Sequence, residues 1–140
     1  MSKQIFIVYG HHNTKKSFNQ SIRDTFIDEA KKNGHKIDLV NLHEEKQLPF
    51  FDGTPPSDQV LDYRDRLEKS DVMFMISPCY NLRATAILEN WIDLVLAPKW
   101  FFSFKRIYLN WGYPKSGAMK NKLAIMSMSY GGNIFSIQTW

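Results

Sequence analysis

The chain has 140 residues, of which 44% are apolar and 23% charged, and its formal net charge is +4. These values are typical of a globular domain with a real core and exclude a disordered chain. Charges of both signs are interspersed, so no basic stripe indicates a nucleic-acid surface, and the longest apolar run is too short for membrane insertion. The single Cys79 excludes an internal disulfide framework. Because Met1 leads directly into a strand without a signal peptide, we expect a cytoplasmic protein.

The first half of the chain predicts a strand, a helix and a second strand. Residues 5–9 form a continuous apolar run, typical of a strand covered on both faces, and Gly10 ends it. Ser17 and Gln20 have the spacing of a capping box, which predicts that a helix begins there. Apolar residues four apart predict a buried stripe on that helix: Phe18, Ile22, Phe26 and Ala30. A second strand is expected over residues 36–42.

The second half continues the same alternation. Pro and Gly residues mark 43–56 as mostly loop, and a helix is expected from Ser57 or Asp58 to Lys69. We expect a third buried strand over residues 72–76, ending at Ser77, and a helix over 85–96. Residues 99–121 read as a long connection of the kind that usually serves function or an interface. A fourth strand is expected over residues 123–128.

Alternation of strands and helices predicts an α/β domain with a parallel sheet, occupying residues 1–140 as one unit without repeat or linker. The loops after the first, third and fourth strands should then gather at one end of the sheet. Ligands of open α/β sheets bind outside the carboxyl ends of the strands. This convergence is the main evidence from the residues themselves for a binding site.

The first of these loops is a candidate phosphate site. Ser17 and Asn19 lie at the start of a helix, whose free amides favour anions, and His11 or His12 can add positive charge. The alternative is that Ser17 only caps the helix. The dinucleotide fingerprint GxGxxG is absent, and His11-His12 lacks the neighbouring ligands that a metal site needs, so no metal is expected.

The loop after the third strand, Pro78-Cys79-Tyr80-Asn81-Leu82, can face a flat ring through its backbone groups. Cys79 has no obvious base and is predicted to be a small buried or half-buried thiol, while Trp91 on a helical stripe is predicted to belong to the core. Gly131-Gly132 after the fourth strand permits close backbone approach to a ligand, or forms a simple turn.

Six motifs along the chain can be compared with known families: Tyr9-Gly10-His11, Lys16-Ser17-Phe18-Asn19, the set Pro78, Tyr80, Ala86, Leu88, Trp91, Asp93 and Val95, the aromatic segment Trp100 to Phe104, Gly112-Tyr113-Pro114, and Ser129-Tyr130-Gly131-Gly132. In these motifs the chain resembles the flavodoxin-like NAD(P)H:quinone oxidoreductases, a family that includes modulator-of-drug-activity and potassium-efflux ancillary proteins. The resemblance covers nearly all of the 140 residues.

The resemblance implies a flavin cofactor, with FMN favoured over FAD, and NAD(P)H as cosubstrate. It implies hydride transfer to the flavin and then transfer of two electrons to a quinone or similar acceptor. It also implies a homodimer with the flavin at the interface, where the aromatic segment makes a contact. No catalytic acid or base is assigned. The implied cofactor contacts are His11, Ser17, Phe18 and Asn19 at the phosphate end, and Pro78, Cys79, Tyr80, Asn81, Leu82, Ser129, Tyr130, Gly131 and Gly132 at the ring.

The chain also departs from the family pattern. Its first loop is one residue longer, so either His11 or His12 can take the family's position, and Arg83, Thr85 and Glu89 replace usual residues. The family's sheet has a fifth strand and a last helix that we expect this chain, which ends at Trp140, to lack. An alternative function is therefore a non-catalytic or regulatory flavin-binding interaction subunit. An electron-carrier flavodoxin is disfavoured because such carriers are generally acidic.

Overall fold

A parallel sheet with helices on both faces forms the body of the protein. The computed structural model describes residues 1–13, 15–108, 111–115 and 117–131. Its elements in chain order are β1 (Gln4–Tyr9), α1 (Phe18–Lys32), β2 (Lys36–Asn41), α2 (Asp58–Lys69), β3 (Val72–Pro78), α3 (Ala86–Val95), β4 (Ser103–Tyr108), β5 (Trp111–Lys115) and β6 (Leu123–Ser129).

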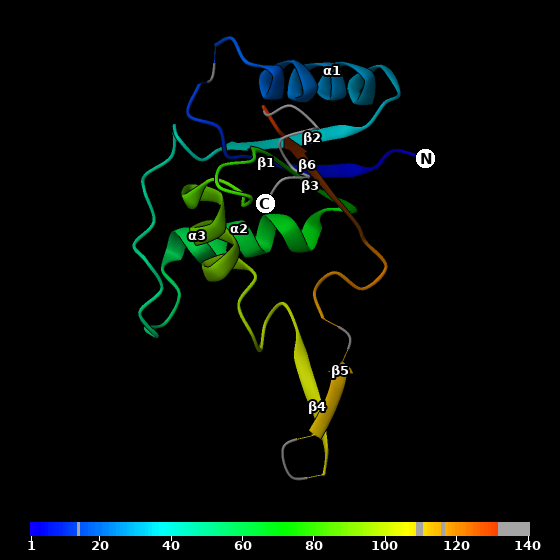
Figure 1. Cartoon of the computed structure of the whole chain (residues 1–140). Coiled ribbons are helices and arrows are strands. Elements are labelled where there is room, and N and C mark those ends of the chain that lie inside the picture. The colour runs from blue at the N-terminus through cyan, green and yellow to red at the C-terminus, as the bar shows by residue number, and fades with distance from the viewer. Residues whose placement is uncertain (14, 109–110, 116, 132–140) are drawn as a thin grey trace, which may run out of the picture.

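Within the described residues, the main sheet has four strands in the order β2-β1-β3-β6, and all three pairings are parallel. Helix α1 covers one face, and α2 and α3 cover the other (Figure 1). The predicted α/β class and doubly wound parallel sheet are therefore confirmed, and the four predicted strands are β1, β2, β3 and β6. Strands β2 and β6 are the edges of the described part of this sheet.

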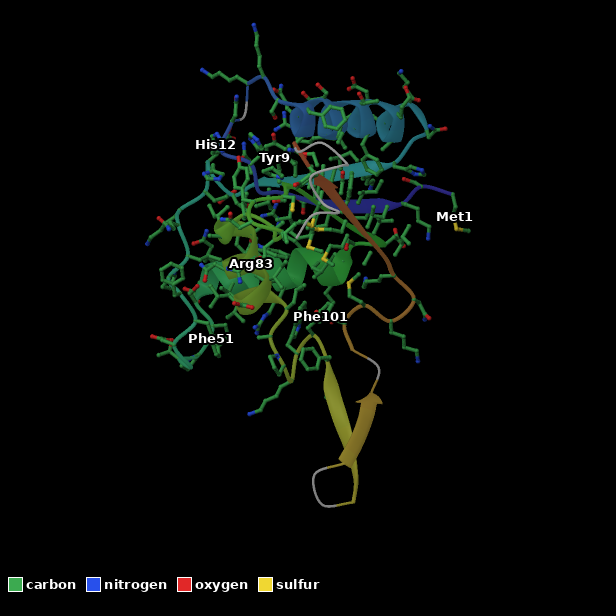
Figure 2. All side chains as sticks on the ribbon, in the orientation of Figure 1. Met1, Tyr9, His12, Phe51, Arg83 and Phe101 are labelled. Atoms are coloured by element: carbon green, nitrogen blue, oxygen red, sulfur yellow. The ribbon has the colours of Figure 1, made fainter. Side chains whose placement is uncertain are left out.

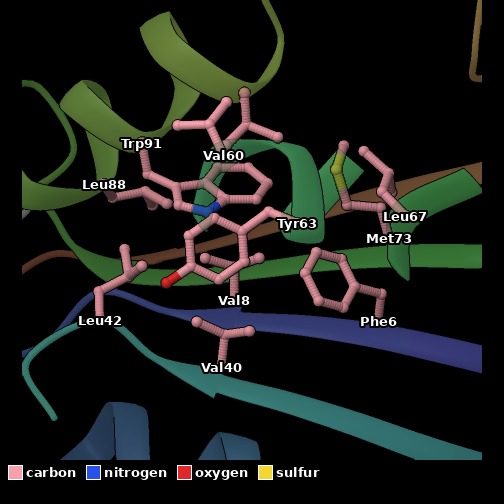
Figure 3. Packing of buried hydrophobic residues seen from close by; sticks show 11 residues of the cluster. Phe6, Val8, Val40, Leu42, Val60, Tyr63, Leu67, Met73, Leu88 and Trp91 are labelled. Atoms are coloured by element: carbon pink, nitrogen blue, oxygen red, sulfur yellow. The ribbon is translucent and has the colours of Figure 1, made fainter. Parts of the chain in front are cut away.

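Two hydrophobic clusters hold the layers together, because successive side chains of a strand point to opposite faces. Ile5, Ile7 and Tyr9 of β1 pack toward α1. Phe6 and Val8 of the same strand pack toward α2 and α3, against Tyr63 and the fully buried Trp91 (Figure 3). The prediction that Trp91 belongs to the core is confirmed.

The stripe predicted on α1 is only partly buried. Ala30 is buried, and Ile22 and Phe26 pack against the cluster below α1, but 72% of Phe18 is exposed. Including Phe18 in this stripe was wrong. Phe18 is the first residue of the helix and is not among the side chains that pack with Ile22 and Phe26 against that cluster.

The connection predicted over residues 99–121 contains an antiparallel hairpin, β4-β5, which the sequence reading missed. In Figure 1 this hairpin projects from the body on the side of α2 and α3. Pro114 lies in β5 opposite Phe104. A proline is tolerated there because β5 pairs with only one neighbour in the described residues, so its other edge needs no N–H donor.

Candidate functional site

The loops after β1, β3 and β6 meet at the carboxyl edge of the sheet. The amide of Gly10 donates to the carbonyl of Ile76 at 2.9 Å, which joins the end of β1 to β3. The amide of Cys79 donates to the carbonyl of Ser129 at 2.7 Å, which joins β3 to β6. The predicted convergence of these three loops is therefore confirmed.

Gly10 and Thr85 bring the first loop against the start of α3. The hydroxyl of Thr85 donates to the carbonyl of Gly10 at 2.6 Å, and the Thr85 amide donates to Ser77 Oγ at 3.1 Å. A Cβ at residue 10 would lie 2.9 Å from Cβ of Leu88, so only glycine fits this contact. Thr85, an anomaly in the sequence, thus ties two strand ends to the helix that begins after it.

The N-terminus of α1 is capped by Ser17. Its Oγ accepts the amide of Gln20 at 3.1 Å and lies 3.1 Å from the hydroxyl of Tyr9. Only this half of the predicted capping box forms: Gln20 Nε2 donates to Asp24 at 3.0 Å, and Gln20 Oε1, which would accept the Ser17 amide in a full box, has no donor among the described residues. The first turn of α1 thus follows the first loop directly, and a helix N-terminus favours an anion such as a phosphate.

Asn19 links α1 to the loop after β6. It is 2% exposed, and its Nδ2 donates to Ser129 Oγ at 2.7 Å. Its Oδ1 is buried, and no hydrogen-bond donor among the described residues reaches it. A buried amide oxygen without a partner is costly, so a ligand N–H or O–H group that reached it would gain a hydrogen bond.

The two histidines of the first loop have different environments. His11 is 8% exposed, and its Nδ1 accepts the amide of Asn13 at 2.8 Å, so the neutral ring carries its hydrogen on Nε2. Burial, aided by repulsion from His12, lowers the pKa of His11 below its ordinary value. His12 is exposed, stacks on His11 with ring centroids 4.6 Å apart, and lies 3.3 Å from the Tyr80 hydroxyl through its Nδ1.

Asn13 was missed by the sequence reading, although it organises the first loop. Its Oδ1 accepts the amides of Lys15 and Lys16 at 3.1 and 3.2 Å, and its Nδ2 donates to the Lys16 carbonyl at 3.0 Å. Asparagine often hydrogen-bonds the backbone two residues later, and this turn preference was the signal available in the sequence. The contacts lead the chain into the N-cap Ser17.

The loop after β3 is a tight turn with an apolar tip. Tyr80 and Arg83 exchange backbone hydrogen bonds of 2.8 and 3.1 Å, and the two residues between them have positive φ angles, 52° at Asn81 and 63° at Leu82. Two left-handed central residues are the mark of a type I′ turn. Leu82 is 77% exposed, so an apolar side chain is held in solvent on a backbone that disfavours it.

The remaining predicted residues surround this turn. Pro78 is buried at the end of β3, and Cys79 is half-buried as predicted. In the loop after β6, Tyr130 is 46% exposed, and a Cβ added to Gly131 would meet no atom within 4 Å. Gly132 lies outside the described residues.

A second structural feature at this edge was not predicted. A cavity of about 510 Å³ lies between the loop after β2 and helix α3, and His43 forms part of its wall. The wall of this cavity also includes Tyr80, one of the predicted cofactor contacts. It includes His12, which the sequence left as an alternative to His11 at the phosphate. Since β2 ends at the same edge as β1, the position of His43 directly after that strand was an available signal.

The described part of the chain was also searched for metal sites and for membrane-spanning helices. No three His, Cys, Asp or Glu side chains there are placed to hold a metal ion together. None of the helices described is long and apolar enough to cross a bilayer.

Comparison with known proteins decides the family. A family model described as a flavodoxin-like fold matches residues 3–139. The chain belongs to the flavodoxin-like fold family. The resemblance stated from the sequence motifs is thereby confirmed at the level of this family.

Relatives of this flavodoxin-like chain are named as redox enzymes. It is 27% identical over 155 residues to the mouse (Mus musculus) ribosyldihydronicotinamide dehydrogenase [quinone], an alignment that covers 93% of the chain but only 64% of the relative. The chain thus spans less than two thirds of the length of this relative.

Solved structures share the fold. The NAD(P)H:quinone oxidoreductase from Methanothermobacter marburgensis superposes with a TM-score of 0.73 at 17% identity, covering 99% of this chain and 72% of the other. An FMN-dependent NADH-azoreductase from Bacillus anthracis, solved in complex with FMN, gives 0.69 at 14% identity, covering 94% and 70%.

Proposed function

We propose that this chain is the FMN-binding part of a flavin-dependent NAD(P)H:quinone oxidoreductase. The observation that carries the proposal is the hydrogen bond from Asn19 to Ser129 at 2.7 Å, which joins the start of α1 to the end of β6 and leaves the buried Asn19 Oδ1 without a partner among the described residues. The names of the relatives support the reaction type. A cytoplasmic homodimer is part of this proposal.

The residues present fit FMN. The start of α1 offers free amides and the hydroxyl of Ser17, and Lys15 and Lys16 add positive charge beside it, which suits a phosphate group. His11 adds a neutral Nε2–H donor if it takes the phosphate position. The backbone of residues 78–82 and the open approach at Gly131 suit the edge of a flat ring, whose N–H or O–H groups can donate to Asn19 Oδ1.

The chemistry would come from the cofactor. Bound FMN would accept a hydride from NAD(P)H and pass two electrons to a quinone. The side chains of the protein would then only have to bind and orient FMN and its substrates, and none of them would have to act as an acid or a base. The exposed Leu82 fits a role in orienting the cofactor. Its turn holds an apolar side chain in solvent, where that side chain could cover the face of a flat ring.

The homodimer is supported by exposed apolar side chains around the site. Phe18 and Leu82 are 72% and 77% exposed, and Phe50 is 76% exposed, all on loops or helix ends near the carboxyl edge. Such residues are enriched where a second chain packs. In the aromatic segment, Cζ of Arg64 lies over the Trp100 ring, 5.2 Å from its centroid. The side chain of Phe104, at the end of the same segment, is not among those described.

One experiment tests the proposal. The purified chain is loaded with FMN, its flavin absorbance near 450 nm is recorded, and NADH or NADPH is added without oxygen. We expect bound flavin to bleach and to recover its colour when a quinone is added. A chain that takes up no FMN contradicts the proposal. Flavin that binds but is never reduced favours the regulatory flavin-binding subunit instead.

A further inference from the structure

Tyr9 places a phenol beneath the N-terminus of α1. It is the last residue of β1, is fully buried, and belongs to the cluster on the α1 side of the sheet. Figure 2 shows Tyr9 below α1, toward the end of the molecule opposite Met1. Cζ of Arg23, whose side chain is 12% exposed, lies over the Tyr9 ring, 4.7 Å from its centroid. This cation–π contact holds the ring in place, and the hydroxyl at its far end reaches the first loop.

Three oxygen atoms meet at the end of the Tyr9 side chain. Tyr9 Oη can donate to the carbonyl of Asn13 at 3.2 Å, and it lies 3.1 Å from Ser17 Oγ, where either atom can be the donor. Ser17 Oγ lies 3.4 Å from the same carbonyl. The two hydroxyl groups bring one hydrogen each to this triangle, so the acceptor that each hydroxyl takes decides what is left for a ligand.

The hydrogen-bonding capacity of Ser17 limits the ligand that it can meet. A serine hydroxyl has one hydrogen to donate and two lone pairs that accept. One lone pair of Ser17 Oγ accepts the amide of Gln20 at 3.1 Å. When Tyr9 donates to Ser17, the second lone pair is filled as well, and Ser17 can only donate. Its ligand must then be an acceptor, such as a phosphate oxygen, and a hydroxyl that accepts two hydrogen bonds is polarised into a stronger donor.

The same oxygen atoms also have a closed arrangement that needs no ligand. Tyr9 then donates to Asn13, and Ser17 donates to Tyr9 Oη, so both hydrogens are used within the protein. An arriving anion takes the hydrogen of Ser17, and the hydrogen of Tyr9 turns from Asn13 to Ser17. Asn13 is an exposed residue, so water can replace Tyr9 at its carbonyl.

We propose that Tyr9 is a positioning residue for the phosphate of FMN: its hydroxyl donates to Ser17 Oγ and thereby directs the hydrogen of Ser17 at a phosphate oxygen. The inference rests on the proposed function and adds to it a buried residue that does not itself touch the ligand. It also gives a reason for a tyrosine at the end of an apolar strand, where the ring of a phenylalanine would fill the same place in the cluster.

Calorimetric titration of Tyr9→Phe with FMN and with riboflavin tests this role. The substitution removes the hydroxyl and keeps the ring under Arg23. We expect the FMN Kd to rise about five- to tenfold, as for one lost hydrogen bond. The riboflavin Kd should change less than about twofold, because riboflavin is the same flavin without its phosphate.

A double-mutant cycle separates positioning from a general loosening of the loop. If Tyr9 acts through Ser17, then adding Tyr9→Phe to Ser17→Ala should change the FMN Kd less than about twofold. Tyr63→Phe is the matched control, because Tyr63 is also buried and its hydroxyl accepts Gln59 Nε2 at 3.0 Å on the opposite face of the sheet. It should bind FMN as the wild type does. Urea unfolding shows that each variant is folded before it is titrated.

Several results would overturn this inference. They are an unchanged FMN Kd in folded Tyr9→Phe, an equal loss of FMN and riboflavin affinity, and a full further loss when Tyr9→Phe is added to Ser17→Ala. Failure of the proposed function is seen separately, as absence of FMN binding by the wild-type protein. Titration of flavin-free protein with inorganic phosphate then decides the role of Tyr9. The phosphate Kd should rise in Tyr9→Phe, and wild-type protein that binds no phosphate overturns the inference.

Discussion

Replacing Gly10 by Ala perturbs the point where three elements meet. The added methyl group would lie 2.9 Å from Cβ of Leu88 and 3.0 Å from Oγ1 of Thr85. The residue has little room to move away, because its amide is held by Ile76 and its carbonyl by Thr85. Relief of the contact must therefore push the start of α3 from the end of β1.

The expected cost follows from these contacts. Overpacking of this kind costs about 1–3 kcal/mol. Weakening the hydrogen bond from Thr85 to Gly10 adds about 1 kcal/mol. Ala restricts the unfolded chain more than Gly does, which returns about 0.4–1 kcal/mol. The free energy of unfolding should thus fall by about 1–3.6 kcal/mol, which lowers the urea midpoint by about 0.5–1.8 M for a slope near 2 kcal/mol/M.

Urea unfolding followed by far-UV circular dichroism measures this change. The matched control is Gly131→Ala, where the new methyl group meets nothing within 4 Å, and its stability should stay within about 0.5 kcal/mol of wild type. A Gly10→Ala protein that unfolds at the wild-type midpoint with an unchanged slope would refute the argument that close packing requires this glycine.

Three further changes have defined outcomes. In Gly117→Ala the new Cβ would lie 1.7 Å from the carbonyl oxygen of Phe101, so hydrogen exchange should show lost protection in the β4-β5 hairpin and unchanged protection in β1. Ser17→Ala should cost about 1 kcal/mol for the cap and also weaken FMN binding; an unchanged FMN Kd in the folded variant counts against the phosphate site. Because burial lowers the pKa of His11 from 6.5, the unfolded chain binds more protons below that pH, so stability is complete above pH 6.5 and declines as the pH falls further. His11→Asn should flatten that part of a urea-measured pH profile, by at most about 1.4 kcal/mol per pH unit, and an unaltered profile would contradict it.

Much of the fold could be predicted because its signals are local. The buried runs of β1 and β3 and the caps at Ser17 and Ser57 each lie within a few residues of the element they define. The hairpin could not be predicted in this way. Gly112 and Pro114 are read as breakers, and only the pairing with β4 makes them compatible with a strand.

The site was harder to predict, because its contacts join distant parts of the chain. The loops could be placed at one edge, but the bond between Asn19 and Ser129 spans 110 residues and leaves no local pattern. Nor does spacing separate His11, which is turned inward by Asn13, from His12, which lies beside Tyr80. The contribution of His43 depends on how the loop after β2 folds against α3.

The pairing of β3 with β6 has a consequence for how the protein folds. Strand β3 ends at Pro78 and its partner β6 begins at Leu123, so the chain must close a loop that includes α3 and the hairpin before these strands meet. Closing a long loop costs conformational entropy and is therefore slow, whereas the β4-β5 hairpin and the helices form between residues that are close in the sequence. We expect β6 to join the sheet last. Ser129 would then reach Asn19 only in that final step. On unfolding, β6 would be the first strand to leave the sheet, and a ligand bound at Asn19 and Ser129 would stabilise the native state against that loss.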